Sequence, residues 1–223
     1  AVGADVDVGL RAYMLRVYNY MALGVAFTGI VSIVVAMSPA AMQVILGPGM
    51  WVLFIGILGL GWFAPRLILT GSAIAGHTAF WVYAAMWGAL IAPYFLIYTG
   101  ESIVRVFFIT AATFAGTSLY GYTTKKDLSP MGRFLMMASI GLIIALVVNF
   151  FMQSAAFHFF TSIIGVLLFA GLTAYETQAI KESYFAGDHA DTVSRKAVFG
   201  AFILYGSFVG LFIFLLSLLG SRE

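Results

Sequence analysis

Seven long apolar stretches dominate this chain of 223 residues. A helix needs about 20 mostly apolar residues to cross the hydrocarbon core of a bilayer. The stretches that meet this length are Val17–Met37, Val44–Ala64, Ser72–Tyr98, Ile103–Tyr122, Phe134–Phe151, Phe157–Ile180 and Ala197–Leu219. Hydrophobic residues make up 62% of the sequence and charged residues 9%, whereas a soluble domain has about 45–50% and about 25%. The sequence therefore predicts an all-α integral membrane protein with seven transmembrane helices.

The connections between these stretches are short, so we expect a single transmembrane domain over residues 17–219. Residues 1–16 are expected to form a cytoplasmic leader. The first stretch is too long for the core of a signal peptide, so we expect it to be a retained helix. Four prolines lie near the ends of stretches, namely Pro39, Pro48, Pro65 and Pro130. Pro93 lies inside the third stretch and is expected to break or kink that helix.

The basic residues divide unequally between the two ends of the seven helices. Arg11, Arg16, Arg66, Lys125, Lys126, Arg133, Lys181, Arg195 and Lys196 fall on the side of the N-terminus, and Arg105 and Arg222 fall on the other. Lysine and arginine accumulate in cytoplasmic loops. We therefore expect a multi-pass protein of the inner (plasma) membrane with its N-terminus in the cytoplasm and its C-terminus outside. The basic residues are scattered over short loops, so nucleic acid is not expected as a partner.

Residues for catalysis or for tight metal binding are sparse. The chain has no cysteine, and it has no Gly-x-Ser-x-Gly elbow and no metal-ligand spacing of histidines on any one helix. The three histidines are spread over the third stretch, the sixth stretch and a loop, at His77, His158 and His189. We therefore expect neither an enzyme nor a cofactor, although an intramembrane enzyme stays open as the least supported alternative.

One carboxylate stands out because it lies within an apolar stretch. Glu176 precedes the last apolar residue of the sixth stretch, Ile180, by more than one helical turn. Ionisable groups inside the membrane are costly and usually face the interior of the helix bundle beside a partner. We expect Glu176 to pair with a cation such as Arg66, at the end of the second stretch. The alternative is a carboxylate that reaches cytoplasmic water beside Lys181.

The seventh stretch carries small residues on one face. Gly206 and Gly210 form a Gly-x-x-x-Gly pair with Ser207 between them. Such a face lets the backbone of a neighbouring helix approach closely. This pattern favours a central position of the last helix in the bundle.

Two segments resemble the Bax inhibitor-1 family, the transmembrane Bax-inhibitor-motif proteins, in its bacterial branch. One runs from Gly165 to Lys181 and contains Tyr175–Glu176–Thr177–Gln178, and the other runs from Phe107 to Leu128. The resemblance implies seven helices with the last one central. It also implies a pH-sensitive calcium leak in which acids of the sixth and seventh helices share a proton and pair with an arginine of the second helix.

Carried over to this chain, the resemblance assigns the acid of the sixth helix to Glu176, where the family commonly has Asp, and the arginine to Arg66. On the seventh helix the family pattern Leu-Tyr-Leu-Asp-Phe corresponds to residues 204–208, which read Leu-Tyr-Gly-Ser-Phe. Ser207 therefore replaces the second acid, so no pair of carboxylates is available to share a proton. Ser207 is still expected to hydrogen-bond the Glu176 carboxylate.

Two functions follow as hypotheses. In the first, calcium or another cation leaks through the protein past Glu176, the one residue expected to contact the ion, and protonation of Glu176 opens the path by releasing Arg66. Because burial and a neighbouring cation act on a carboxyl pKa in opposite directions, only the dependence of the pH response on Glu176 is predicted. In the second, the protein does not conduct and instead binds and modulates other membrane proteins in the stress response. Its partners are then the lipid bilayer and those proteins.

Overall fold

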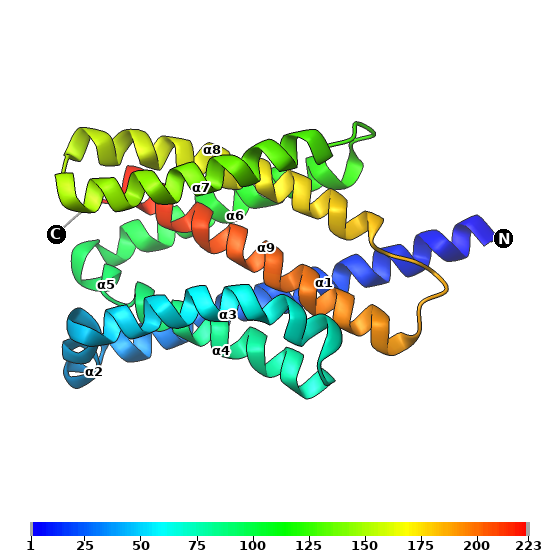
Figure 1. The fold of residues 1–223 in the computed structure, drawn as a ribbon, viewed down its shortest axis with the longest axis horizontal. Helices are drawn as coiled ribbons and strands as arrows, with labels where there is room; N and C mark the ends of the chain where they lie inside the picture. The colour runs from blue at the N-terminus through cyan, green and yellow to red at the C-terminus, as the bar shows by residue number, and fades with distance from the viewer. Residues whose placement is uncertain (1, 222–223) are drawn as a thin grey trace. The chain divides into compact units, whose positions relative to one another are not determined.

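The computed structural model describes residues 2–221, and the side chains of residues 8–221. The described part is helical, without a β-strand (Figure 1). Its elements are α1 (Val2–Ala36), α2 (Pro39–Val44), the π-helical turn η1 (Ile45–Gly49), α3 (Met50–Thr70), α4 (Ala73–Ile91), α5 (Tyr94–Ile97), α6 (Gly100–Thr123), α7 (Ser129–Met152), α8 (Ala155–Glu182) and α9 (Ala190–Leu219). Arg222, counted above among the basic residues, lies outside the described residues.

Seven helical segments of the described chain are long and apolar enough to cross a membrane, as the sequence predicted. The first of them begins at Val8, because α1 continues toward the N-terminus through much of the expected leader. The seven-helix membrane fold is therefore confirmed. The single domain over residues 17–219 stays a prediction, since the chain forms two compact units by its internal contacts.

The prolines act differently from one another. Pro93 lies between α4 and α5, so the expected break in the third stretch is confirmed. The expected end of the second stretch before Pro65 is wrong, because α3 continues through Pro65 to Thr70. A proline removes one helical hydrogen bond. Proline is tolerated within transmembrane helices, where neighbouring groups can satisfy the freed backbone carbonyl, and Arg66 accordingly lies within α3.

The first unit contains the chain up to Tyr98 together with Ser183–Tyr205. In it, α4 packs against both α1 and α3. Thr28 of α1 joins three elements, because its Oγ1 donates to the Ala84 carbonyl of α4 (3.0 Å) and lies 2.7 Å from the hydroxyl of Tyr205 on α9. One turn further along α1, Ser32 Oγ donates to the Gly88 carbonyl (2.7 Å). Hydroxyl groups thus connect the helices where no charge is available.

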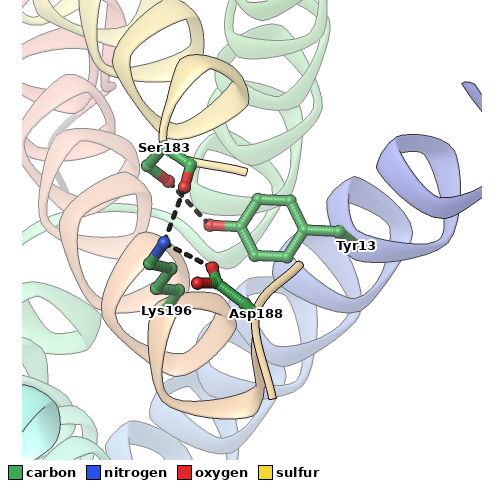
Figure 2. A network of polar contacts seen from close by, with 4 residues as sticks. All are labelled: Tyr13, Ser183, Asp188 and Lys196. Carbon is green, nitrogen blue, oxygen red and sulfur yellow. Dashed lines mark hydrogen bonds and ion pairs between the residues drawn. The ribbon is translucent and has the colours of Figure 1, made fainter. Parts of the chain in front are cut away.

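The connection between α8 and α9 is fixed by a polar network in the same unit (Figure 2). Lys196 Nζ lies 2.6 Å from Asp188 Oδ2 and donates to the Ser183 carbonyl at 2.9 Å. The hydroxyl of Tyr13 on α1 lies 3.2 Å from Ser183 Oγ. Lys196 therefore holds the start of α9 to two residues of the preceding loop, and Ser183 of that loop in turn contacts α1 through Tyr13.

The second unit contains Thr99–Glu182 and the part of the chain from Gly206 onward. In it, α8 packs against both α6 and α7. Leu142, Leu168, Leu172 and Phe214 form its buried core. The rings of Phe169 on α8 and Phe214 on α9 stack with their centroids 5.8 Å apart.

Helix α9 is the most buried of the seven spans. In its apolar window 61% of the residues are buried, against at most 28% in any other span. Its residues up to Tyr205 belong to the first unit and those from Gly206 to the second, which agrees with a central last helix. The expected role of Gly210 is wrong in detail, since a Cβ there would lie 2.5 Å from the ring of Phe169 rather than against a helix backbone. A close approach to a helix backbone occurs elsewhere, for example at Gly121 of α6, beside Ala174 of α8.

Candidate functional site

Glu176 lies near the C-terminal end of α8, inside the span Ala155–Glu182, and is partly buried. Its Oε2 accepts a hydrogen bond of 2.6 Å from the hydroxyl of Ser207 on α9. The hydrogen bond expected from the sequence is therefore present, and both residues belong to the second unit. A hydrogen bond to an ionised oxygen is stronger than one between neutral groups, so the pair joins α8 to α9 most firmly while Glu176 is charged.

The neighbours of Glu176 along the chain each contact a different element. The ring of Tyr175 packs directly on Gly132 of α7, where a side chain would have no room. Thr177 Oγ1 lies 2.9 Å from Ser118 Oγ on α6. Successive residues of a helix point about 100° apart. One turn of α8, Tyr175–Gln178, which we call the YETQ turn, therefore contacts α7, α9 and α6 together.

Gln178 completes the YETQ turn by holding the loop between α6 and α7. Its Oε1 accepts from the Leu128 backbone N–H (2.8 Å), and its Nε2 donates to the Lys126 carbonyl (2.8 Å). In the same loop, Asp127 accepts a hydrogen bond from the Ser129 backbone N–H (2.8 Å), and hydrogen bonding to Ser129 holds the pKa of Asp127 below its ordinary range. The loop at this end of the second unit is therefore ordered by side-chain contacts to its backbone.

Lys181 is engaged away from Glu176. Its Nζ donates to the Tyr122 carbonyl at 2.8 Å and lies 5.5 Å from the centroid of the Tyr122 ring. The Glu176 carboxylate accepts a hydrogen bond from Ser207 instead. These contacts agree with an inward Glu176 carboxylate, and the alternative, a carboxylate that reaches water beside Lys181, gains no support from them.

Arg66 belongs to the first unit. It lies on α3, is exposed, and lines a cavity of about 320 Å³ with Phe63, Leu67, Thr70 and Gly71. The expected pairing of Arg66 with Glu176 would join the two units, and it stays a prediction. The same holds for a contact between Glu176 and a permeating cation. In the described part of the chain no three His, Asp or Glu side chains gather as ligands for a metal ion.

The sequence interpretation missed Thr177, Gln178 and Ser118. Thr177 and Gln178 are buried, although their position next to Glu176 was noted only as part of a family motif. The signal that could have identified them is a run of three hydrogen-bonding side chains at consecutive positions near the end of an apolar span. Such a run places polar groups on several faces of one helix, and each of them then requires a partner.

Replacing Gln178 by Leu is expected to destabilise the second unit by roughly 2–4 kcal/mol, because the Leu128 N–H and the Lys126 carbonyl both lose their partner. Thermal unfolding of the purified protein in detergent measures the effect. Gln43→Leu is the matched control, since Gln43 is exposed on α2. Equal unfolding temperatures of the two variants would contradict the role given to Gln178.

Seven membrane-length helices and an ionisable side chain held within one of them define a multi-pass α-helical membrane protein with an intramembrane polar site. The family model described as "Inhibitor of apoptosis-promoting Bax1" matches residues 10–223, and the chain belongs to this Bax inhibitor family. The match covers both units and the YETQ turn, so the resemblance seen in the sequence is confirmed.

Three bacterial relatives are similar over nearly their whole length. An uncharacterized protein of Caulobacter vibrioides is 40% identical, with 98% of this chain and 92% of the relative covered. An uncharacterized protein of Rickettsia prowazekii is 39% identical, with 97% and 92% covered. The inner membrane protein YbhL of Escherichia coli K12 is 38% identical, with 96% and 94% covered.

Proposed function

We propose that this protein is a pH-sensitive cation leak of the inner membrane whose conduction depends on Glu176. The observation that carries the proposal is the hydrogen bond of 2.6 Å between Ser207 on α9 and a Glu176 carboxylate that lies inside a membrane span. An intramembrane carboxylate is expensive and typically marks an ion or proton path. The permeating ion is calcium or another cation, which the Glu176 carboxylate attracts while the path is closed and which hydroxyl groups can coordinate weakly enough for release once it is open.

The proposed gate closes when Glu176 is ionised. In that state its carboxylate accepts the hydrogen bond from Ser207 and pairs with Arg66, so α8 and α9 stay together. Protonation at acid pH removes the negative charge and weakens both interactions, and the ion path opens. The orientation that we propose, with the N-terminus in the cytoplasm, rests on nine basic residues on that side against two on the other.

Calcium flux into proteoliposomes between pH 5 and 8, about a thousandfold range of proton concentration, measures this dependence. The wild-type flux is expected to rise as the pH falls. Glu176→Gln is expected to leak at all pH values at about the acid level of the wild type, because the glutamine cannot ionise. The matched control is Glu182→Gln, since Glu182 is exposed at the end of α8, and its flux should follow the wild type.

An equal pH response of Glu176→Gln and the wild type would remove Glu176 from the mechanism. Absence of flux for any cation at any pH would contradict the leak itself. That outcome would favour the second candidate, a non-conducting protein that binds other membrane proteins in the stress response. The replacement of the family's second acid by Ser207 supports this candidate, because one carboxylate attracts a divalent ion less strongly than two.

A further inference from the structure

A polar cavity of about 90 Å³ lies in the first unit, where the end of α3 meets the beginnings of α4 and α9. Its polar lining residues are His77, Asp191, Ser194 and Arg195. By this measure of volume, about 10–15 Å³ is enough to hold one water molecule. The cavity therefore has room for a small polar group of the size of a phosphate.

Two opposite charges reach this cavity without pairing with each other. Asp191 and Arg195 are four residues apart on α9, the spacing at which opposite charges on a helix usually pair. Among the described residues, however, no ion pair joins Asp191 to Arg195. The adjacent Lys196 pairs with Asp188 instead (Figure 2). The Arg195 guanidinium makes a contact of 3.4 Å to the Leu69 carbonyl, which is long for a hydrogen bond. Both charges are therefore available to a ligand.

Two further polar side chains complete the cavity. His77 of α4 is partly buried, and its ring packs against that of Tyr20 on α1 with the centroids 5.4 Å apart. Ser194 lies beside Arg195 on α9 and is also partly buried. An imidazole, a hydroxyl and a guanidinium are all donors that bind phosphate oxygens. The cavity thus combines a set of donors for an anion with one carboxylate for a cation.

The position of the cavity corresponds to the headgroup layer of a membrane. Span α3 ends at Thr70, and spans α4 and α9 begin at Ala73 and Ala190. The polar lining residues lie within five residues of these ends, or about 8 Å at a rise of ~1.5 Å per residue. The headgroup region is roughly 5–8 Å thick on each side of a bilayer. Apolar side chains beside the cavity are exposed, at 41% for Leu69 and 80% for Ile74, as expected of residues that contact acyl chains.

We propose that this cavity binds the headgroup of a phosphatidylethanolamine, with the phosphate held by Arg195, His77 and Ser194 and the primary ammonium held by Asp191. Phosphatidylglycerol has no cation to neutralise Asp191. The quaternary ammonium of phosphatidylcholine has no N–H to donate to a carboxylate. A zwitterionic lipid with a primary amine therefore matches both charges of the cavity, independently of whether the protein conducts ions.

The test measures lipid binding to the purified, delipidated protein by native mass spectrometry, with phosphatidylethanolamine, phosphatidylcholine and phosphatidylglycerol of identical acyl chains. Phosphatidylethanolamine is expected to bind at least about tenfold more tightly than the other two, the effect of one charge-assisted contact. Arg195→Gln is expected to weaken its binding about tenfold or more. Asp191→Asn is expected to abolish the preference over phosphatidylcholine. Lys125→Gln and Glu182→Gln, which change exposed charges that are not among the residues lining the cavity, should bind as the wild type does.

Equal affinities for the three lipids, or unchanged binding in Arg195→Gln and Asp191→Asn, would overturn the proposal. Water-soluble phosphoethanolamine provides a further arm. If it binds as tightly as the lipid, the ligand is a free phosphate compound and the assignment to a lipid is wrong. Should Arg195→Gln fail to fold, Arg195→Lys retains the charge but loses the planar fork of donors, and it is expected to weaken phosphatidylethanolamine severalfold.

Discussion

Valine in place of Gly121 is expected to disrupt the packing of α6 against α8 and to destabilise the second unit by about 3 kcal/mol or more. A Cβ at Gly121 would lie 2.8 Å from the carbonyl carbon of Ala174 and closer still to its oxygen. These are backbone atoms of a helix, so they cannot move aside as the end of a flexible side chain can. Because Ala174 directly precedes the YETQ turn, displacement of α8 also alters the surroundings of Glu176.

Gly116→Val provides the matched control for this experiment. Gly116 lies on the same helix, and a Cβ there meets no atom within 4 Å. Thermal unfolding in detergent should therefore show a large loss of stability for Gly121→Val and little change for Gly116→Val. Similar unfolding temperatures for the two variants would mean that α6 and α8 do not approach as closely as described.

Aspartate in place of Ser207 is expected to convert the pH response of cation flux from one step into two. The Ser207 hydroxyl lies 2.6 Å from Glu176 Oε2, so the substitution brings a second carboxylate into direct contact with the first. Two carboxylates at such a distance do not both ionise readily and instead share a proton. Their protons are then lost in steps that are separated by more than about one pH unit. This expectation rests on the proposed leak function.

Flux into proteoliposomes as a function of pH measures the change. Ser207→Asn is the control, because asparagine has nearly the shape of aspartate but no charge, and its curve should keep a single step. The prediction would be contradicted if the curve of flux against pH for Ser207→Asp superimposed on the curve for Ser207→Asn. It would show that Glu176 does not share its proton with residue 207.

The number and positions of the seven helices could be predicted because membrane insertion depends on the length of an apolar run, a local property of the sequence. The end of the second helix could not be predicted, because the sequence does not show whether a helix ends at a proline such as Pro65 or continues through it. At Pro93 the same residue type does interrupt the helix.

The candidate site was predictable to a smaller extent. Glu176 could be identified because a carboxylate in an apolar stretch is rare, and the family pattern aligned Ser207 with its expected partner. The partners of Thr177 and Gln178 could not be identified in the same way. They depend on the rotation of α8 about its own axis, which determines that Ser118 and the α6–α7 loop lie opposite these side chains. The pairing of Arg66 with Glu176 would join a residue of the first unit to one of the second, and it remains a prediction.

The YETQ turn has a consequence for the kinds of sequence change that this helix can accept. A point substitution in the turn removes one of its contacts, with α6, α7, α9 or the loop between α6 and α7. Deletion of a single residue from α8 ahead of Tyr175 would instead rotate the whole turn by about 100° and misalign all four side chains at once. The helix is therefore expected to tolerate an exchange of residue type far better than a change in its length.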